Sequence, residues 1–281
     1  MRRPGGLVFG FVCLCLSGAS PVRADVPIDL TLEYEAYFGG MHVASARTQI
    51  YRDATTYHIQ GKARARGLLD WYSEWKGQVS SRGQVQEGLR VEPNTHVNDG
   101  VWRGKERRNS LTFNPDGTVD VTRDAPEEDD IVTPVPKDSI PGSIDPITAI
   151  LSLSGLIQQG EQCQGTVPVY DGRRRYDMSV TPDGMRTFER NDYTVFSGEA
   201  MACRLEFDRI GGFREQTSNK YTKTAHNRLV WVASPFPDTL PIPVRVEVDT
   251  DFGTLIVHLT AARYRDQEVA LEPGGDNLAD D

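Results

Sequence analysis

The sequence lacks the short motifs by which many enzymes are recognised. It contains no Gly-x-Ser-x-Gly nucleophile elbow, P-loop, dinucleotide-binding glycine pattern or His-Glu-x-x-His zinc motif. Its five histidines are scattered, and both His58 and His258 fall on the polar side of their predicted strands. We therefore predict no cofactor and no enzyme class. A hydrolase stays a minor alternative, because a Ser-His-Asp set meets only in space.

Long apolar runs are also absent, apart from a short one near the start. Leu7–Leu16 follows the basic Met1-Arg2-Arg3 and precedes small residues that end at Val22-Arg23-Ala24. The run is too short for a membrane-spanning helix. This order predicts a secretory signal peptide over residues 1–24, with a mature start at Asp25. An N-terminal anchor is the alternative; no transmembrane segment is predicted elsewhere.

Positive charge is scarce in the expected mature chain. Without the three arginines of residues 1–24, 28 basic residues face 40 acidic ones, which gives a net charge of −12. Nucleic acid and anionic membranes attract basic surfaces. The overall charge therefore argues against either as the main partner.

Cysteine is equally sparse. Cys13 and Cys15 leave with the signal peptide, so only Cys163 and Cys203 remain. No Cys-x-x-Cys or His-x-x-x-His spacing accompanies them, which argues against a metal site. An even pair in an exported protein predicts a disulfide.

Strict alternation of apolar and polar residues is what the sequence has in abundance. In the stretch Ile28–Ala36 every even position is apolar, as in a half-buried strand. Similar stretches recur between turn signals, and Pro-Asp-Gly at 115–117 and 182–184 predicts two of the turns. The crowded cations Arg103, Lys105, Arg107 and Arg108 are interpreted as a solvated edge strand.

A single good helix candidate interrupts the strands. Asp145 is a natural N-cap, Pro146 suits the first turn, and Gly160 ends an apolar stretch without charge. We predict an all-β fold: a long curved antiparallel sheet rolled into an open barrel, with this one short buried helix on its concave side. The alternative is two packed β subdomains.

Three segments define the predicted domain organisation. Residues 25–266 form a single β-rich domain, interrupted by an exposed loop near 124–141 that is rich in acidic residues and proline. Residues 267–281 form a disordered acidic tail. The alternative of two subdomains would divide the chain at the 124–141 loop.

Two places could bind a ligand. An Asp171-Gly172 hairpin would pair Val169 with Arg174 and so place Arg174 and Tyr176 on an apolar strand face. A cation there indicates a buried ion pair, or a buried stem whose charged head reaches water, and an anion or ligand anchor is the alternative. Trp71 and Trp75 belong to an aromatic cluster that either lines a ligand cavity or fills the core.

Several of these stretches also carry a resemblance. They are Tyr34–Gly40, Asp145-Pro146 with its helix, Tyr170–Tyr176, Cys203 and Pro243-Val244-Arg245. On these residues the chain resembles the domain of unknown function 3108 family of Gram-negative cell envelopes. The resemblance implies a periplasmic, β-rich protein and no reaction.

Three functions follow as hypotheses. The first is a non-enzymatic binding or envelope-integrity protein, whose partner is an unknown envelope protein. The second is a carrier of a lipid or other amphipathic small molecule in the rolled sheet. The third and weakest is a hydrolase.

Overall fold

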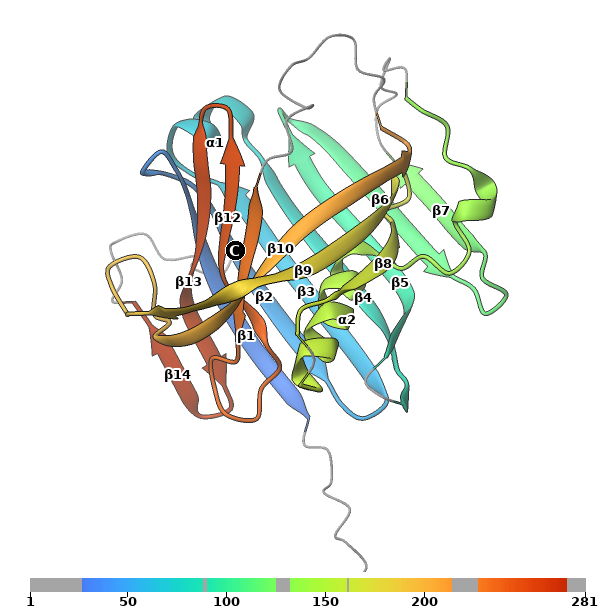
Figure 1. The fold of residues 1–281 in the computed structure, drawn as a ribbon. Helices are drawn as coiled ribbons and strands as arrows, with labels where there is room; N and C mark the ends of the chain where they lie inside the picture. Colours follow the sequence, from blue (N-terminus) through green and yellow to red (C-terminus); the bar gives the residue numbers. More distant parts are fainter. Residues whose placement is uncertain (1–26, 88–89, 125–131, 161, 214–226, 272–281) are drawn as a thin grey trace, which may run out of the picture.

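One large antiparallel sheet dominates the computed structural model of the protein (Figure 1). The structure describes residues 27–271, except 88–89, 125–131, 161 and 214–226. Its 14 strands follow the order β7-β6-β5-β4-β3-β2-β1-β13-β12-β11-β10-β9-β8, with β14 paired to β13. The sheet thus consists of two meanders that join where β1 pairs with β13.

The first meander comprises β1 (Ile28–Phe38), β2 (Met41–Arg52), β3 (Thr56–Ala65), β4 (Lys76–Val85), β5 (Val91–Trp102), β6 (Lys105–Phe113) and β7 (Val119–Asp124). The second comprises β8 (Gly165–Tyr170), β9 (Arg175–Phe188), β10 (Gly198–Gly211), β11 (Arg228–Ala233), β12 (Ile242–Thr250), β13 (Gly253–Tyr264) and β14 (Gln267–Ala270). Between them lie α2 (Pro146–Gln158) and the 3-10 turn η2 (Lys137–Ser139), while α1 (Gly67–Ser73) connects β3 to β4.

The apolar residues that alternate with polar ones in β1 are buried, as predicted. Ile28, Leu30 and Leu32 are buried in the main core cluster. Side chains of a strand point alternately to opposite faces, so Glu33 lies on the other face, 3.7 Å from Arg47. The prediction of a half-buried strand is confirmed. Through its pairing with β13, β1 joins the two meanders.

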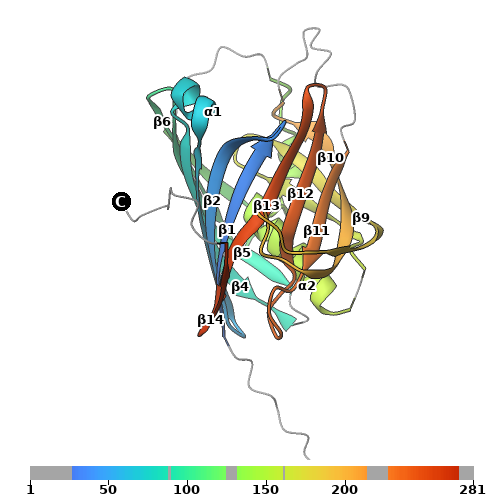
Figure 2. The same ribbon diagram turned by 90° about the vertical axis from the view of Figure 1, so that its left-hand side faces the viewer.

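The sheet curves until its two halves face each other, with α2 between them (Figure 2). Among the described residues no backbone ladder joins the end strands β7 and β8, so the barrel stays open. One hydrogen bond between the two ends of the sheet runs from Asn109 Nδ2 on β6 to the carbonyl of Asp171, in the β8–β9 loop, at 2.5 Å. The predicted all-β fold with an open, rolled sheet is confirmed. The sheet also runs without a break through β1 and β13, contrary to the alternative of two subdomains.

Helix α2 begins and ends as predicted. Asp145 is its N-cap, and its carboxylate accepts hydrogen bonds from the backbone N–H groups of Ile147 and Thr148. Gly160 follows the helix with a φ of 83°, which glycine adopts at no steric cost. Leu151 packs into the main core cluster, whereas Ala149 and Leu153 pack into a second cluster with Val169 and Met178. The helix therefore joins the two cores of the curved sheet.

Some predicted boundaries change. A second Pro-Asp-Gly, at 182–184, makes no turn, since β9 continues through it with an irregular register against Met201 and Cys203. The tail expected to be disordered from Gln267 first forms β14, because Ala261–Tyr264 offers it a free strand edge. In the 124–141 loop, Pro134, Lys137 and Asp138 are exposed as expected. The predicted signal peptide lies outside the described residues.

Cys163 and Cys203 lie at disulfide distance, with 2.15 Å between their sulfur atoms. Both side chains are buried in the second core cluster. Cys163 belongs to the connection from α2 to β8, and Cys203 lies in β10, two strands away in the sheet. The bond therefore holds the end of α2 against the second meander.

We predict that Cys163→Ala/Cys203→Ala folds but loses stability. Closing a loop of 40 residues stabilises by roughly 4 kcal/mol in the chain-entropy model. Thermal melts and non-reducing gels of wild type and variant measure the effect. Equal mobility of the oxidised and reduced wild-type protein would show that the bond does not form.

Candidate functional site

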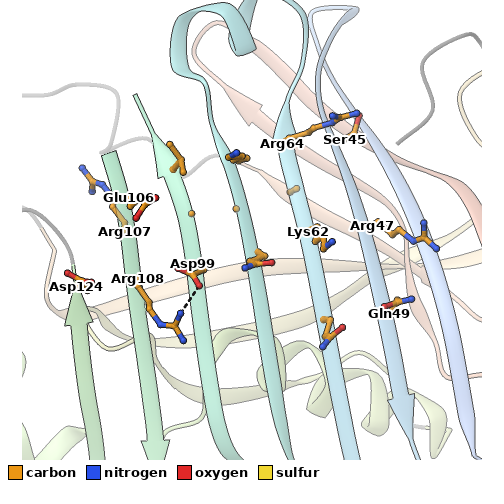
Figure 3. Close-up of a pocket in the computed structure, with 17 residues that line it drawn as sticks. Ser45, Arg47, Gln49, Lys62, Arg64, Asp99, Glu106, Arg107, Arg108 and Asp124 are labelled. Carbon is orange, nitrogen blue, oxygen red and sulfur yellow. Dashed lines mark hydrogen bonds and ion pairs between the residues drawn. The ribbon is translucent and has the colours of Figure 1, made fainter. Parts of the chain in front are cut away.

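A broad groove crosses the first meander on strands β2 to β7 (Figure 3). Its volume is about 1040 Å³. Most of its side chains alternate with Tyr57, Ser81 and His96, which point to α2. The groove therefore opens mainly on the face of the sheet turned away from the helix.

Cations outnumber carboxylates in the groove by six to three. The cations are Arg47, Lys62, Arg64, Lys76, Arg107 and Arg108, and the carboxylates are Asp99, Glu106 and Asp124. This excess contrasts with the net charge of −9 of the whole chain. The groove is thus a positive region on an acidic protein.

Two pairs of like charges face each other directly across the strands. Arg47 on β2 lies opposite Lys62 on β3, and Arg64 on β3 lies opposite Lys76 on β4. Like charges directly opposite each other destabilise a sheet. We call Arg47, Lys62, Arg64 and Lys76 the four-cation cluster. Repulsion within the four-cation cluster lowers the stability of the sheet, and at Arg47 the Glu33 carboxylate offsets part of it.

The two ends of the groove differ in charge compensation. At the β5–β7 end, Arg108 lies between Asp99 and Asp124 in the register and 3.1 Å from the Asp99 carboxylate. At the β2–β4 end, Arg47 lies 3.7 Å from Glu33, but Lys62 and Lys76 form no ion pair or hydrogen bond with any described residue. The buried Nε–H of Arg64 donates to none of the described residues. The positive charge of the groove is therefore least compensated at the four-cation cluster.

Sequence reasoning did not identify this groove. Lys62 and Arg64 alternate with Ala63 and Ala65 in the sequence of β3, but their partners on β2 and β4 follow only from the register. The predicted edge strand is also wrong, because β6 lies between β5 and β7. Its Arg107 and Arg108 line the groove instead.

Trp71 lies in α1 and Trp75 shortly after it, in the connection from β3 to β4. Trp71 is 84% exposed, so its side chain neither belongs to the core nor lines an enclosed cavity. Trp75 is half-buried, and its ring lies 3.8 Å from where a Cβ on Gly77 would stand. Gly67–Ser73 of this stretch forms the short helix α1.

Arg174 does not lie where the hairpin signal placed it. The β8–β9 loop has four residues, so Val169 pairs with Tyr176 and Tyr170 with Arg175. The Asp171 side chain accepts hydrogen bonds from the backbone N–H groups of Arg173 and Arg174, which stabilises the longer loop. The Arg174 side chain is 50% exposed, whereas that of Arg175 is 8% exposed.

Tyr176 packs against the second core cluster, edge-on to Phe207 at 5.5 Å between ring centroids. Burial raises its pKa to about 12. Arg174 and Tyr176 both lie near Phe213. They belong to the second meander, so the structure does not gather them with Trp71 and Trp75 into one site.

A serine, a histidine and an aspartate do meet, at the start of α2. Ser81 Oγ donates to Asp145 Oδ1 at 2.7 Å, and His96 Nδ1 lies 3.0 Å from the same oxygen. In a catalytic triad the serine faces Nε2 and the carboxylate faces Nδ1. Here Ser81 also lies 2.7 Å from Nδ1. All three residues are buried, so the cluster attaches α2 to β4 and β5.

The carboxylate of this cluster is stabilised in its charged form. Burial alone would raise the pKa of Asp145, but the hydrogen bond and charge of His96 and the hydroxyl donors of Thr148 and Ser81 hold it below its usual range. The hydroxyl of Tyr57 continues the network to Thr148 at 2.6 Å.

A second cluster borders the groove at Ser45. The Ser45 hydroxyl donates to Glu35 at 2.6 Å and accepts from Arg66 Nε at 2.8 Å, and Glu35 also contacts His42. Ser45 Oγ lies 3.5 Å from His42 Nε2. Its proton is thus directed to the carboxylate, and its side chain is buried. The arrangement orients Glu35 and Arg66 and does not present a nucleophile.

The described residues lack both a metal-ligand cluster and a membrane-spanning helix. Across the described ranges, no three His, Cys, Asp or Glu side chains gather as metal ligands. In the same ranges, no helix has the length and apolar composition needed to cross a membrane.

Comparison with known proteins assigns the family. The model of DUF3108, a protein family of unknown function, matches residues 33–260. The chain belongs to this family. The match includes the groove, the Asp145 cluster and the disulfide of the DUF3108 protein described above. No curated protein matches the chain. A similar solved structure is a β-barrel-like protein with domain DUF1849 from Brucella abortus, 11% identical, covering 85% of this chain and 99% of that one with a TM-score of 0.49.

We predict that Asp145→Ala lowers the free energy of unfolding by about 3 kcal/mol or more. It removes an N-cap and leaves buried donors on Ser81 and His96 unpaired. Because the folded pKa of Asp145 is depressed, this contribution is complete above roughly pH 4 and disappears as the pH falls through the folded pKa. Urea unfolding over a pH series measures both effects. The exposed Asp138→Ala is the control, and an equal loss in the two variants would contradict the assignment.

The corrected register leads to a second comparison. Arg175 Nε donates to the Ser139 carbonyl at 2.7 Å, and its guanidinium lies 2.6 Å from Asp177. We expect Arg175→Ala to cost about 2 kcal/mol, reduced from the value for a fully buried pair because Asp177 is partly exposed. Arg174→Ala should change stability by less than about 0.5 kcal/mol. Thermal melts that reverse this order would support the two-residue hairpin instead.

Proposed function

We propose that this protein is an exported, non-enzymatic binding protein of the bacterial envelope, and that the groove on β2–β7 holds an anionic ligand. The observation that supports it is the four-cation cluster, with its two directly opposed pairs of like charge. Such pairs are retained at a cost in stability. Binding of an anion is the function that offsets this cost.

The size and chemistry of the groove define the ligand further. A volume of about 1040 Å³ suits a molecule of drug size or larger, or one segment of a polymer. Cations extend from β2 to β6, so several anionic groups can be contacted at once. Arginine and lysine pair with phosphate and carboxylate oxygens through charge-assisted hydrogen bonds. We therefore expect a ligand with more than one phosphate or carboxylate group.

The N-terminal sequence and the cysteine pair support the location. Residues 1–24 have the order of a secretory signal peptide, and an exported protein meets the phosphates and carboxylates of envelope lipids and polymers. The buried cysteine pair at disulfide distance suits an oxidising compartment.

We predict that the mature protein binds tripolyphosphate, a probe with several phosphate groups, in calorimetric titrations at low salt. Lys62→Gln/Lys76→Gln removes one member of each like-charge pair and should weaken binding about tenfold or more. The same variant should melt at the wild-type temperature or slightly above it, because repulsion between Arg47 and Lys62 and between Arg64 and Lys76 is lost.

The control is Arg90→Gln/Arg263→Gln, which removes the same charge from two exposed places outside the groove. It should bind tripolyphosphate as the wild type does. If both double variants lose affinity equally, binding follows net charge and not the groove, and the proposal fails.

A second candidate is a carrier of an amphipathic anion. One observation favours it: Leu68 and Trp71 on α1 are highly exposed, and α1 is flanked in the chain by Arg64 and Lys76 of the groove. A ligand with an anionic head and an apolar tail would contact both regions. Native mass spectrometry of protein purified from the envelope distinguishes the two functions, since only the carrier should retain lipid.

A further inference from the structure

Large apolar side chains gather on the outside of α1 and the neighbouring β5–β6 hairpin. Trp71, Leu68 and Tyr72 are 84%, 76% and 62% exposed, and Leu69 and Trp102 are also exposed. The Arg103 guanidinium lies 4.6 Å from the Tyr72 ring and 5.9 Å from the Trp102 ring, which connects the two elements. We call Leu68, Leu69, Trp71, Tyr72 and Trp102 the aromatic rim.

The rim is held in place by backbone contacts. Before α1, the Arg66 N–H donates to the Val43 carbonyl of β2 at 2.9 Å, and after it the Arg103 N–H donates to the Ser73 carbonyl at 2.9 Å. Within it, the Ser73 hydroxyl donates to the Leu69 carbonyl. These hydrogen bonds hold both ends of α1, so the backbone that carries the exposed aromatic side chains has a defined position.

Further exposed apolar residues lie at the same end of the molecule. Met41 follows the β1–β2 turn, and Phe252 lies in the β12–β13 turn; both are exposed. Both turns and α1 are found at the top in Figures 1 and 2, opposite the end with β14. One end of the protein therefore carries apolar side chains on three separate projections.

The charge around the rim is opposite to that of the chain. Residues 64–76 and 101–108 contain seven cations and three carboxylates, whereas the whole chain has a net charge of −9. The overall charge argues against anionic membranes as partners, but a local cluster decides which face is attracted. Arg64 and Lys76 belong to both the rim's surroundings and the groove, so the two surfaces are continuous.

We propose that the aromatic rim docks on the surface of a bilayer that contains anionic phospholipid. Tryptophan and tyrosine are enriched at membrane interfaces, where the ring is buried and its polar atom remains hydrated. Neighbouring arginine and lysine residues attract anionic headgroups. Several apolar tips at one end suit a flat, extended partner, whereas a folded protein would cover a single patch. Docking would place the groove beside the headgroups, whatever ligand the groove itself binds.

The experiment is flotation of the full mature protein with vesicles. Vesicles of equal parts phosphatidylethanolamine and phosphatidylglycerol should carry the protein upward, while pure phosphatidylcholine vesicles should carry much less. Leu68→Ser/Trp71→Ser should reduce the bound fraction about tenfold or more, because two side chains that would enter the interface are lost. Both residues are exposed, so the fold should persist, and tripolyphosphate binding in the groove should be unchanged.

The matched control is Met185→Ser/Tyr193→Ser, which removes two exposed apolar side chains of β9 and the β9–β10 connection. It should float as the wild type does. Equal flotation with the neutral and anionic vesicles, or equal flotation of the rim variant and wild type, would overturn the proposal. So would sedimentation that shows a dimer in the wild type and a monomer in the rim variant, since the rim would then bind a second copy.

Discussion

The buried carboxylate of Asp145 is the contact on which the arrangement of the molecule depends. A rolled sheet that does not close must cover its inner face, and α2 performs this task by entering both core clusters. Apolar packing alone leaves the start of a helix with unpaired N–H groups. Asp145 satisfies two of them and simultaneously accepts from Ser81 on β4. The position of the helix along the sheet is thereby fixed by directed hydrogen bonds.

This support allows the opposite face to be used differently. The inner face of the first meander holds the small or apolar residues Ile59 and Ala63, while the alternating residues Lys62 and Arg64 point outward. Charges on the outer face cost little desolvation, but repulsion between direct neighbours is retained. A sheet stabilised from its inner face can tolerate that repulsion. The repulsion between cations in the groove is therefore tolerated, because contacts on the inner face of the sheet stabilise the fold.

The sequence predicted the features that depend on local chemistry. Alternation in Ile28–Ala36, the N-cap at Asp145 and the pairing of two remaining cysteines each have a direct physical cause in neighbouring residues or in composition. Where two local solutions compete, prediction failed. Asp171-Gly172 suits a two-residue turn, but the Asp171 side chain instead bonds two following N–H groups and opens a four-residue loop. The buried arginine of this hairpin is accordingly Arg175, which pairs with Asp177, and not Arg174.

The groove and the aromatic rim could not be predicted in this way, because each is formed by residues from several separate segments of the sequence. The four-cation cluster needs the pairing of three strands, and the exposure of Trp71 depends on α1 projecting beyond the sheet. A short apolar helix would ordinarily be assigned to the core, since aromatic side chains contribute most to burial. Here α1 connects the ends of the neighbouring strands β3 and β4. Its outer side chains, such as Trp71, are not covered by any other described element. The same connection brings Arg64 and Lys76 opposite each other, so the connection from β3 to β4 contributes to both surfaces.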